Sequence, residues 1–173
     1  MTGSRESFDE LVAAADPAMV VVTTAADVER AGCLVGFHGQ ASMDPQRYAV
    51  WLSKANHTYR VALRSTHHAV HFLGVEDLAL AELFGTRSGE DQDKFIDVPF
   101  ETGPHGVPLV TALSRRMVLE RIALLDDGGD HVCLTGRLVR AEGDGDFEPL
   151  RASRVADLEP GRPPQARVID PHG

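Results

Sequence analysis

The sequence has few cysteines, few aromatic residues and no long hydrophobic run. Its two cysteines, Cys33 and Cys133, lie in different expected strands with no C-x-x-C pairing, so we interpret them as buried free thiols. The longest apolar runs, such as residues 18–22, are far too short to span a membrane. No basic segment followed by an apolar one marks a secretory signal at the start. We therefore expect a cytoplasmic protein with no membrane partner.

Basic residues are also scarce relative to acidic ones. The chain has 17 Lys and Arg against 26 Asp and Glu, a formal net charge of −9. Nucleic acid would be repelled overall, although local donors can still hold a small anion. Hydrophobic residues make up 43% of the 173, which is enough for a folded core. Five of the ten prolines fall in residues 143–173. We expect one domain over residues 1–158 and a C-terminal tail over 159–173.

The order of the expected elements favours an antiparallel sheet. Asp127-Gly128-Gly129 separates two extended runs and marks a hairpin. Ser7 and Glu10 have capping-box spacing at the start of a first helix. No β-α-β alternation is maintained, so a barrel or sandwich with a few helices is favoured over a doubly wound sheet. The patterns predict helices at 6–15, 56–64 and 76–85, strands at 18–24, 31–38, 47–53, 69–73, 116–125 and 131–141, and mostly loop over 86–109.

Several common catalytic and binding motifs are absent. The sequence contains no P-loop, no G-x-S-x-G nucleophile elbow and no Rossmann G-x-G-x-x-G. His67, His68 and His71 are close in sequence, but adjacent strand residues point to opposite faces. No Cys, Asp or Glu with ligand spacing completes a set around them, so we expect no metal site.

The segment 53–60 leaves an expected strand and enters an expected helix. Ser53, Asn56 and Thr58 are short polar residues at a helix start, where backbone N–H groups are free. Such a terminus can bind an anion, and Lys54 and Arg60 add positive charge. Plain helix capping explains the same residues.

The turn after Asp127 places His131 at the start of a strand. The preceding Asp130 is able to accept a hydrogen bond from its imidazole. A histidine held in this way can act on a charged substrate, whereas the simpler interpretation is an exposed turn histidine.

Taken together, these segments resemble the flavin reductase-like family, whose fold is the FMN-binding split barrel. The similarity covers about residues 17–140. Each motif is weak alone, but their shared order along the chain is specific. The matching segments are 19–24, Gly32, 42–45, 53–58, 69–73, 78–84, 93–95 (D-[KR]-F), 106–109 (G-x-P-L) and 129–131 (G-D-H).

The resemblance implies a mostly β fold with a few helices, an antiparallel Greek-key split barrel. It implies a homodimer, an FMN or FAD cofactor, NADH or NADPH as hydride donor, and a flavin-dependent monooxygenase as a further partner. It also implies roles for particular residues. Ser53, Asn56 and Thr58 lie near the FMN phosphate, His131 faces the nicotinamide, and Lys94 is either a cofactor ligand or a surface loop lysine. Segment 34–38 lies along the isoalloxazine, giving Val35, Gly36, Phe37 and His38 as its contacts.

The chain departs from the family pattern at the ring segment. The family usually has hydroxyl-rich T-A-S-S where this chain has Leu34-Val35-Gly36-Phe37-His38. Asn56 replaces the usual Ser, and His71 replaces the usual Asn. These changes leave two hypotheses. One is a flavin reductase, and the other is a split barrel that binds FMN, a deazaflavin or a haem-like ligand without turning over flavin.

Overall fold

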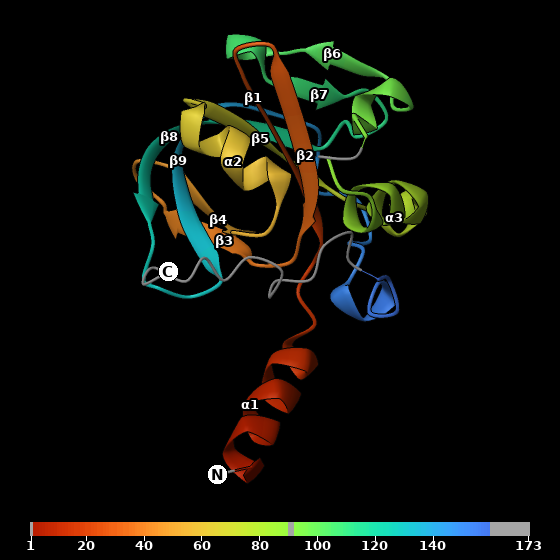
Figure 1. The fold of residues 1–173 in the computed structure, drawn as a ribbon. Coiled ribbons are helices and arrows are strands. Elements are labelled where there is room, and N and C mark those ends of the chain that lie inside the picture. Colours follow the sequence, from red (N-terminus) through yellow and green to blue (C-terminus); the bar gives the residue numbers. More distant parts are fainter. Residues whose placement is uncertain (1, 90–91, 160–173) are drawn as a thin grey trace.

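Nine strands and three helices form the part of the chain that the computed structural model describes, residues 2–89 and 92–159. Seven strands build one antiparallel sheet in the order β2-β1-β5-β8-β9-β4-β3, and β6 pairs with β7 beside it (Figure 1). The helices are α1 (Thr2–Ala15), α2 (His57–Arg64) and α3 (Leu78–Thr86). The strands are β1 (Val20–Ala26), β2 (Glu29–Val35), β3 (His38–Ser42), β4 (Arg47–Ser53), β5 (His67–Phe72), β6 (Phe100–Thr102), β7 (Pro108–Val110), β8 (Arg116–Leu125) and β9 (His131–Glu142).

The large sheet is curled into a barrel that is split along one side. β2 and β3 are opposite edges of the sheet, yet only Gly36 and Phe37 separate them in the chain. A flat sheet cannot bring its two edges this close, so the sheet must bend until they meet. The Trp51 N–H donates to the Phe37 carbonyl at 2.9 Å, which extends the pairing of β4 with β3 to the residue just before β3. The expected antiparallel split barrel with a few helices is confirmed.

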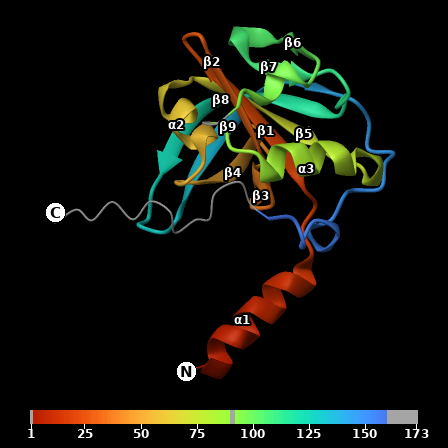
Figure 2. The same ribbon diagram turned by 45° about the vertical axis from the view of Figure 1, so that its right-hand side comes forward.

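The barrel interior is filled by the aliphatic residues that alternate along its strands. Those interior side chains are almost fully buried; they include Val20, Val22, Val50, Leu52, Val70, Val132 and Leu134. α2 contacts β1, β2 and β4, and its Ala62 packs into this same core. α3 packs on the outer face of β1 and β2 (Figure 2). Phe84 and Phe95 belong to the same buried cluster as Val21 of β1. β1 is therefore buried on both faces, which explains its unbroken Val-rich sequence.

Several elements expected from sequence have the observed bounds, because local signals define them. β4 and β8 match their expected ranges. The backbone N–H of Thr58 donates to the Asn56 side chain at 3.4 Å, so Asn56 is the N-cap of α2 as expected.

Other expectations were wrong at their boundaries. The first helix begins at Thr2, and Ser7 lies inside it, where its hydroxyl donates to the Gly3 carbonyl at 2.9 Å instead of capping. The strand expected over 31–38 ends at Val35, because the chain turns at Gly36 to join the other sheet edge. The expected loop 86–109 contains β6 and the start of β7, which are short and lack an alternating pattern.

The rest of the expected tail, residues 160–173, lies outside the described residues. None of the helices that the described residues form is long and apolar enough to cross a membrane.

Candidate functional site

Two cavities lie next to each other along β2, the edge strand beside the split. The larger, of about 790 Å³, is lined by consecutive residues 28–32, and the smaller, of about 100 Å³, by consecutive residues 33–37. The two sets follow each other along the chain, so the cavities are neighbours along β2, and we refer to them together as the groove. Besides β2, the larger is lined by His57, Arg60, Arg64, Gly89, Asp93, Lys94 and Phe95, and the smaller by Trp51, Ser53, Asn56 and His131.

The larger cavity is positively charged, although the chain as a whole is acidic. Its lining has four Lys or Arg side chains and two carboxylates. Both carboxylates are already paired: Asp93 with Arg30 at 3.0 Å, and Glu29 with Arg64. These pairs are partly exposed and add little to stability. By formal charge, the described lining residues carry two more basic than acidic side chains, which favours an anionic ligand.

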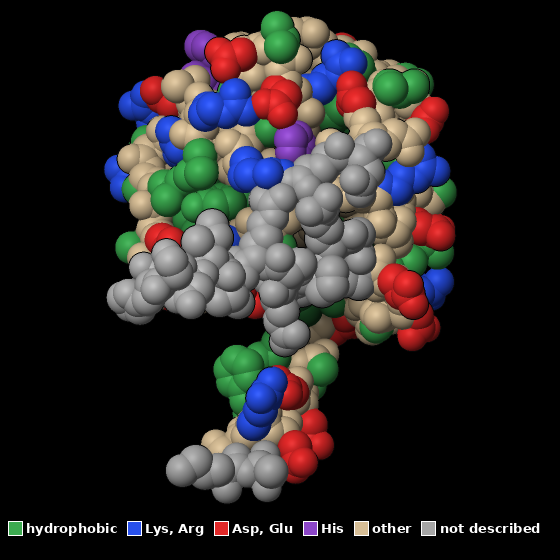
Figure 3. Space-filling model, in the orientation of Figure 1, with side chains coloured by type: hydrophobic (Ala, Val, Ile, Leu, Met, Phe, Trp, Pro, Cys, Tyr) green, Lys and Arg blue, Asp and Glu red, His purple; other side chains and the backbone are tan. Residues whose placement is uncertain are grey.

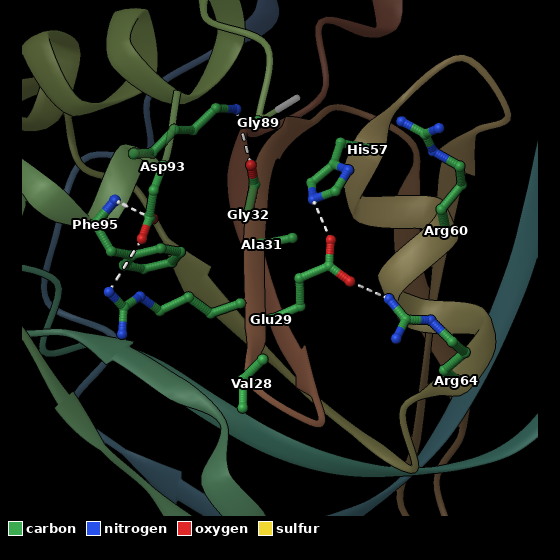
Figure 4. Close-up of a pocket in the computed structure, with 12 residues that line it drawn as sticks. Val28, Glu29, Ala31, Gly32, His57, Arg60, Arg64, Gly89, Asp93 and Phe95 are labelled. Carbon is green, nitrogen blue, oxygen red and sulfur yellow. Dashed lines mark hydrogen bonds and ion pairs between the residues drawn. The ribbon is translucent and has the colours of Figure 1, made fainter. Parts of the chain in front are cut away.

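His57 begins α2 and points across the larger cavity toward Glu29 (Figure 4). Its Nε2 lies 3.4 Å from the Glu29 carboxylate. Its Nδ1 is buried and has no hydrogen-bond partner among the described residues. Burial lowers the pKa of His57, against the opposing effect of Glu29.

Lys94 is buried rather than on a surface loop. Its ammonium donates to the carbonyls of Gly32 at 2.8 Å and Phe84 at 2.9 Å, which joins the loop to β2 and α3. Burial lowers the pKa of Lys94. An ammonium has three donors, and these two bonds use two of them. Among the described residues, the third N–H has no acceptor.

Of the polar residues at the start of α2, some line the smaller cavity and others do not. Ser53 and Asn56 line the smaller cavity, and Ser53 Oγ accepts from the Ala55 N–H at 3.3 Å. The Thr58 side chain is buried toward the barrel and lines neither cavity. Lys54 is turned away, and its amino group pairs with Asp126 at 2.8 Å.

An aromatic wall encloses the smaller cavity. The rings of Phe37 and His131 are 4.9 Å apart, and His131 Nδ1 donates to Asp130 at 2.7 Å. This hydrogen bond lowers the pKa of Asp130. Phe37 and Trp51 are 52% and 39% exposed, which is unusual for such large rings and leaves their faces open to a ligand.

The remaining candidates of the ring segment have different surroundings. Val35 and Gly36 line the smaller cavity, with the Val35 side chain in the core. The His38 ring is fixed between the Tyr48 hydroxyl at 2.7 Å and the Ala18 carbonyl at 2.6 Å, and it does not line the cavity.

Sequence reasoning did not find His57 or Trp51. Trp51 was detectable, because alternation along β4 places it on the face opposite the buried Leu52. His57 carries no such signal, because its burial depends on the packing of Gly89, where an added Cβ would lie 2.9 Å from the imidazole.

The histidines of β5 are part of the structure and not of the groove. His68 and His71 are buried, and burial lowers the pKa of each to about 4. The His71 imidazole donates to the Val21 carbonyl at 3.2 Å and accepts from the Val110 N–H at 3.1 Å. Within the described ranges no group of three or more His, Cys, Asp or Glu side chains is placed to hold a metal ion.

A family model described as the flavin reductase like domain matches residues 14–155. The chain belongs to the flavin reductase-like family. The match covers the whole barrel and both cavities, so the family resemblance seen in the sequence is confirmed.

Curated proteins and solved structures are also similar to this chain. The ferric-chelate reductase (NAD(P)H) of Archaeoglobus fulgidus is 27% identical over 87% of this chain and 90% of its own length. The FMN reductase (NADH) SmoA of Agrobacterium fabrum is 29% identical over 78% and 75%. The structure of a flavin reductase domain protein from Arthrobacter sp. FB24 has a TM-score of 0.75 at 18% identity, over 85% of this chain and 89% of that one.

Proposed function

We propose that the protein is a nicotinamide-dependent flavin reductase that binds its flavin along β2. The observation that carries this proposal is the pair of neighbouring cavities along β2, one with an aromatic wall and one with a lining rich in Lys and Arg, inside a flavin reductase-like domain. A flavin mononucleotide has the same two ends, a flat ring and a phosphate.

The residues present fit both ends of such a molecule. Phe37, Trp51 and His131 offer ring faces for the isoalloxazine, since aromatic rings stack in offset or tilted arrangements. Lys94 offers a third ammonium N–H to the phosphate, and His57 lies in the wall of the same cavity. The start of α2 lies between the two ends and supplies Asn56 and Ser53.

When bound, a flavin supplies the redox chemistry, accepting a hydride from the nicotinamide. The chain supplies position, because holding two rings face to face removes several kcal/mol of barrier. Asp130 fixes the orientation of the His131 imidazole through its hydrogen bond at 2.7 Å. His131 is thereby placed at the open side of the cavity, where we assign it to the nicotinamide nucleotide.

The preferred flavin is FMN, with FAD as the alternative, and the donor is NADH or NADPH. The names of the two curated relatives support a nicotinamide donor. The absence of hydroxyl groups from Leu34 to His38 favours a second candidate, a barrel that binds FMN, a deazaflavin or a haem-like ligand without turnover.

We further propose that the protein is a cytoplasmic homodimer that supplies reduced flavin to a monooxygenase. The family resemblance supports both partners. The exposed Phe37 and Trp51 support a contact at the open side of the groove, because large exposed rings commonly mark interfaces.

Equilibrium binding tests the proposed cofactor. Titration of the flavin-free protein with FMN is expected to quench flavin fluorescence with one site per chain. Anaerobic NADH or NADPH is then expected to bleach the bound flavin. Binding without bleaching supports the second candidate, and absence of binding contradicts both.

A further inference from the structure

The first helix, α1, extends away from the barrel and leaves an apolar face uncovered (Figure 1). Residues 3–15 are all exposed. Phe8, Leu11 and Val12 are 65%, 73% and 44% exposed, and their spacing places them on one face of the helix. Hydrophobic side chains gather on one side of this helix and acidic ones on the other (Figure 3).

A helix of this length needs a partner. α1 has 14 residues, and isolated helices of about 12–15 residues are marginal in water. Gly3 weakens it further. Its stability must therefore come from packing its apolar face against another surface.

The base of α1 is fixed in a direction that leads away from its own barrel. The Asp16 carboxylate accepts from the Ser153 N–H at 2.7 Å and from the Ser153 hydroxyl at 2.8 Å. The Ala152 N–H donates to the Pro17 carbonyl at 2.9 Å, and Ala18 forms a bridge with Arg151. These bonds hold the junction in place, and the described residues of the same chain leave residues 3–15 of α1 exposed.

A matching surface is present on the barrel itself. A groove of about 250 Å³ has an apolar lining of Tyr48, Met117, Leu138 and Ala141, and Arg47 also lines it. Arg47 is exposed and makes no ion pair with any described carboxylate. The polar Gln40, Ser42 and Gln46 also line this groove, which is mostly apolar, and its one charged residue is Arg47.

We propose that α1 of one copy docks in this groove of a second copy, and that the two copies exchange helices about a two-fold axis. Phe8, Leu11 and Val12 face the apolar lining, and Asp9, beside that stripe, faces Arg47. A second copy is the favoured occupant because one chain carries both surfaces, so each dimer contains the contact twice. A membrane is disfavoured, since helices that lie on membranes are rich in Lys and Arg, whereas α1 has Arg5 alone against three acidic residues.

This inference rests on the proposed homodimer, and a charge scan of α1 tests both. Leu11→Glu places a charge on the apolar face, and Ala13→Glu places the same charge on the opposite face. Neither changes the barrel, which α1 does not cover. Sedimentation velocity over a range of concentrations is expected to show wild type and Ala13→Glu as dimers with equal dissociation constants. For Leu11→Glu the constant is expected to rise about tenfold or more.

Cysteine cross-linking locates the docking site. A Leu11→Cys chain mixed with a Gln40→Cys chain is expected to form a disulfide-linked pair, because Gln40 also lines the groove. Ala13→Cys with Gln40→Cys is the matched control and is expected to stay unlinked. The native Cys33 and Cys133 are buried and do not compete.

Failure of the α1 docking can be distinguished from failure of the proposed homodimer. If wild type is a dimer that Leu11→Glu does not weaken, or if Leu11→Cys fails to link, the docking of α1 is wrong and the homodimer stands. If wild type is a monomer, both are wrong. Flavin bleaching by the nucleotide is scored separately and does not depend on either result.

Discussion

Replacement of Lys94 by Met tests whether the buried ammonium serves the phosphate as well as the fold. Lys94→Met removes hydrogen bonds to the Gly32 and Phe84 carbonyls while it keeps most of the side-chain volume. Two charge-assisted bonds at about 1.5–3 kcal/mol each set an upper bound of about 3–6 kcal/mol. The burial that lowers the pKa of Lys94 shows that the charge itself is costly, so part of this loss is recovered. We expect the free energy of unfolding to fall by about 2 kcal/mol in urea titrations.

The phosphate contribution is separated by comparing FMN with riboflavin, which lacks the phosphate. If the third N–H of Lys94 meets the phosphate, Lys94→Met loses about 1.5–3 kcal/mol of FMN affinity, roughly ten- to 150-fold. Its riboflavin affinity is expected to stay within about twofold of wild type. The FMN loss should shrink as salt concentration rises, because added ions screen the charge.

Lys54→Met is the matched control. It removes the same charge close to α2, but Lys54 pairs with Asp126 and lines neither cavity. We expect its FMN affinity to match that of wild type. Equal losses for FMN and riboflavin in Lys94→Met, or equal FMN losses in both variants, would refute a phosphate role for Lys94.

Two further predictions concern histidines. His131→Ala is expected to leave FMN affinity nearly intact and to lower kcat/KM for the nucleotide by roughly ten- to a hundredfold; equal rates of bound-flavin reduction at every nucleotide concentration would remove His131 from the site. Burial holds the pKa of His68 and of His71 near 4, below the ordinary 6.5. The unfolded chain therefore binds more protons, so their stability contribution is complete above about pH 6.5 and is lost toward pH 4, by up to about 3 kcal/mol for each. His68→Leu is expected to make urea stability less dependent on pH across this window, and an unchanged dependence would contradict the assignment.

Local signals in the sequence were sufficient for much of the barrel. The hairpin between β8 and β9 follows from the glycines after Asp127, and the start of α2 follows from Asn56 as a cap. Both depend on residues within a few positions of the feature, so composition and spacing carry the information.

Features that depend on tertiary packing were not predictable in this way. The end of β2 at Val35 is imposed by closure of the barrel, since the chain must cross there to the opposite sheet edge. Lys94 has the sequence setting of a surface loop, and the carbonyls that bury it come from β2 and α3. The unpartnered nitrogen of His57 likewise depends on a distant glycine, Gly89.

The candidate cofactor site along β2 was predicted in part from local sequence, and in part it depends on tertiary packing. The family motifs pointed to segments 34–38 and 53–58 from sequence alone, and both contain residues that line the smaller cavity. The geometry divided these candidates, with Ser53 and Asn56 at the cavity and with Thr58 and the His38 ring away from it. Side-chain direction at a helix start or a strand break depends on the local backbone dihedral angles, which residue types alone do not specify.

Anaerobic stopped-flow mixing of the FMN-loaded protein with NADH or NADPH tests the central claim most directly. A nicotinamide-dependent flavin reductase is expected to lose its visible flavin absorbance orders of magnitude faster than free FMN under the same conditions. The rate should saturate with nucleotide concentration, because the nucleotide occupies a site before the hydride moves. Reduction no faster than that of free FMN with either nucleotide would contradict the proposed activity.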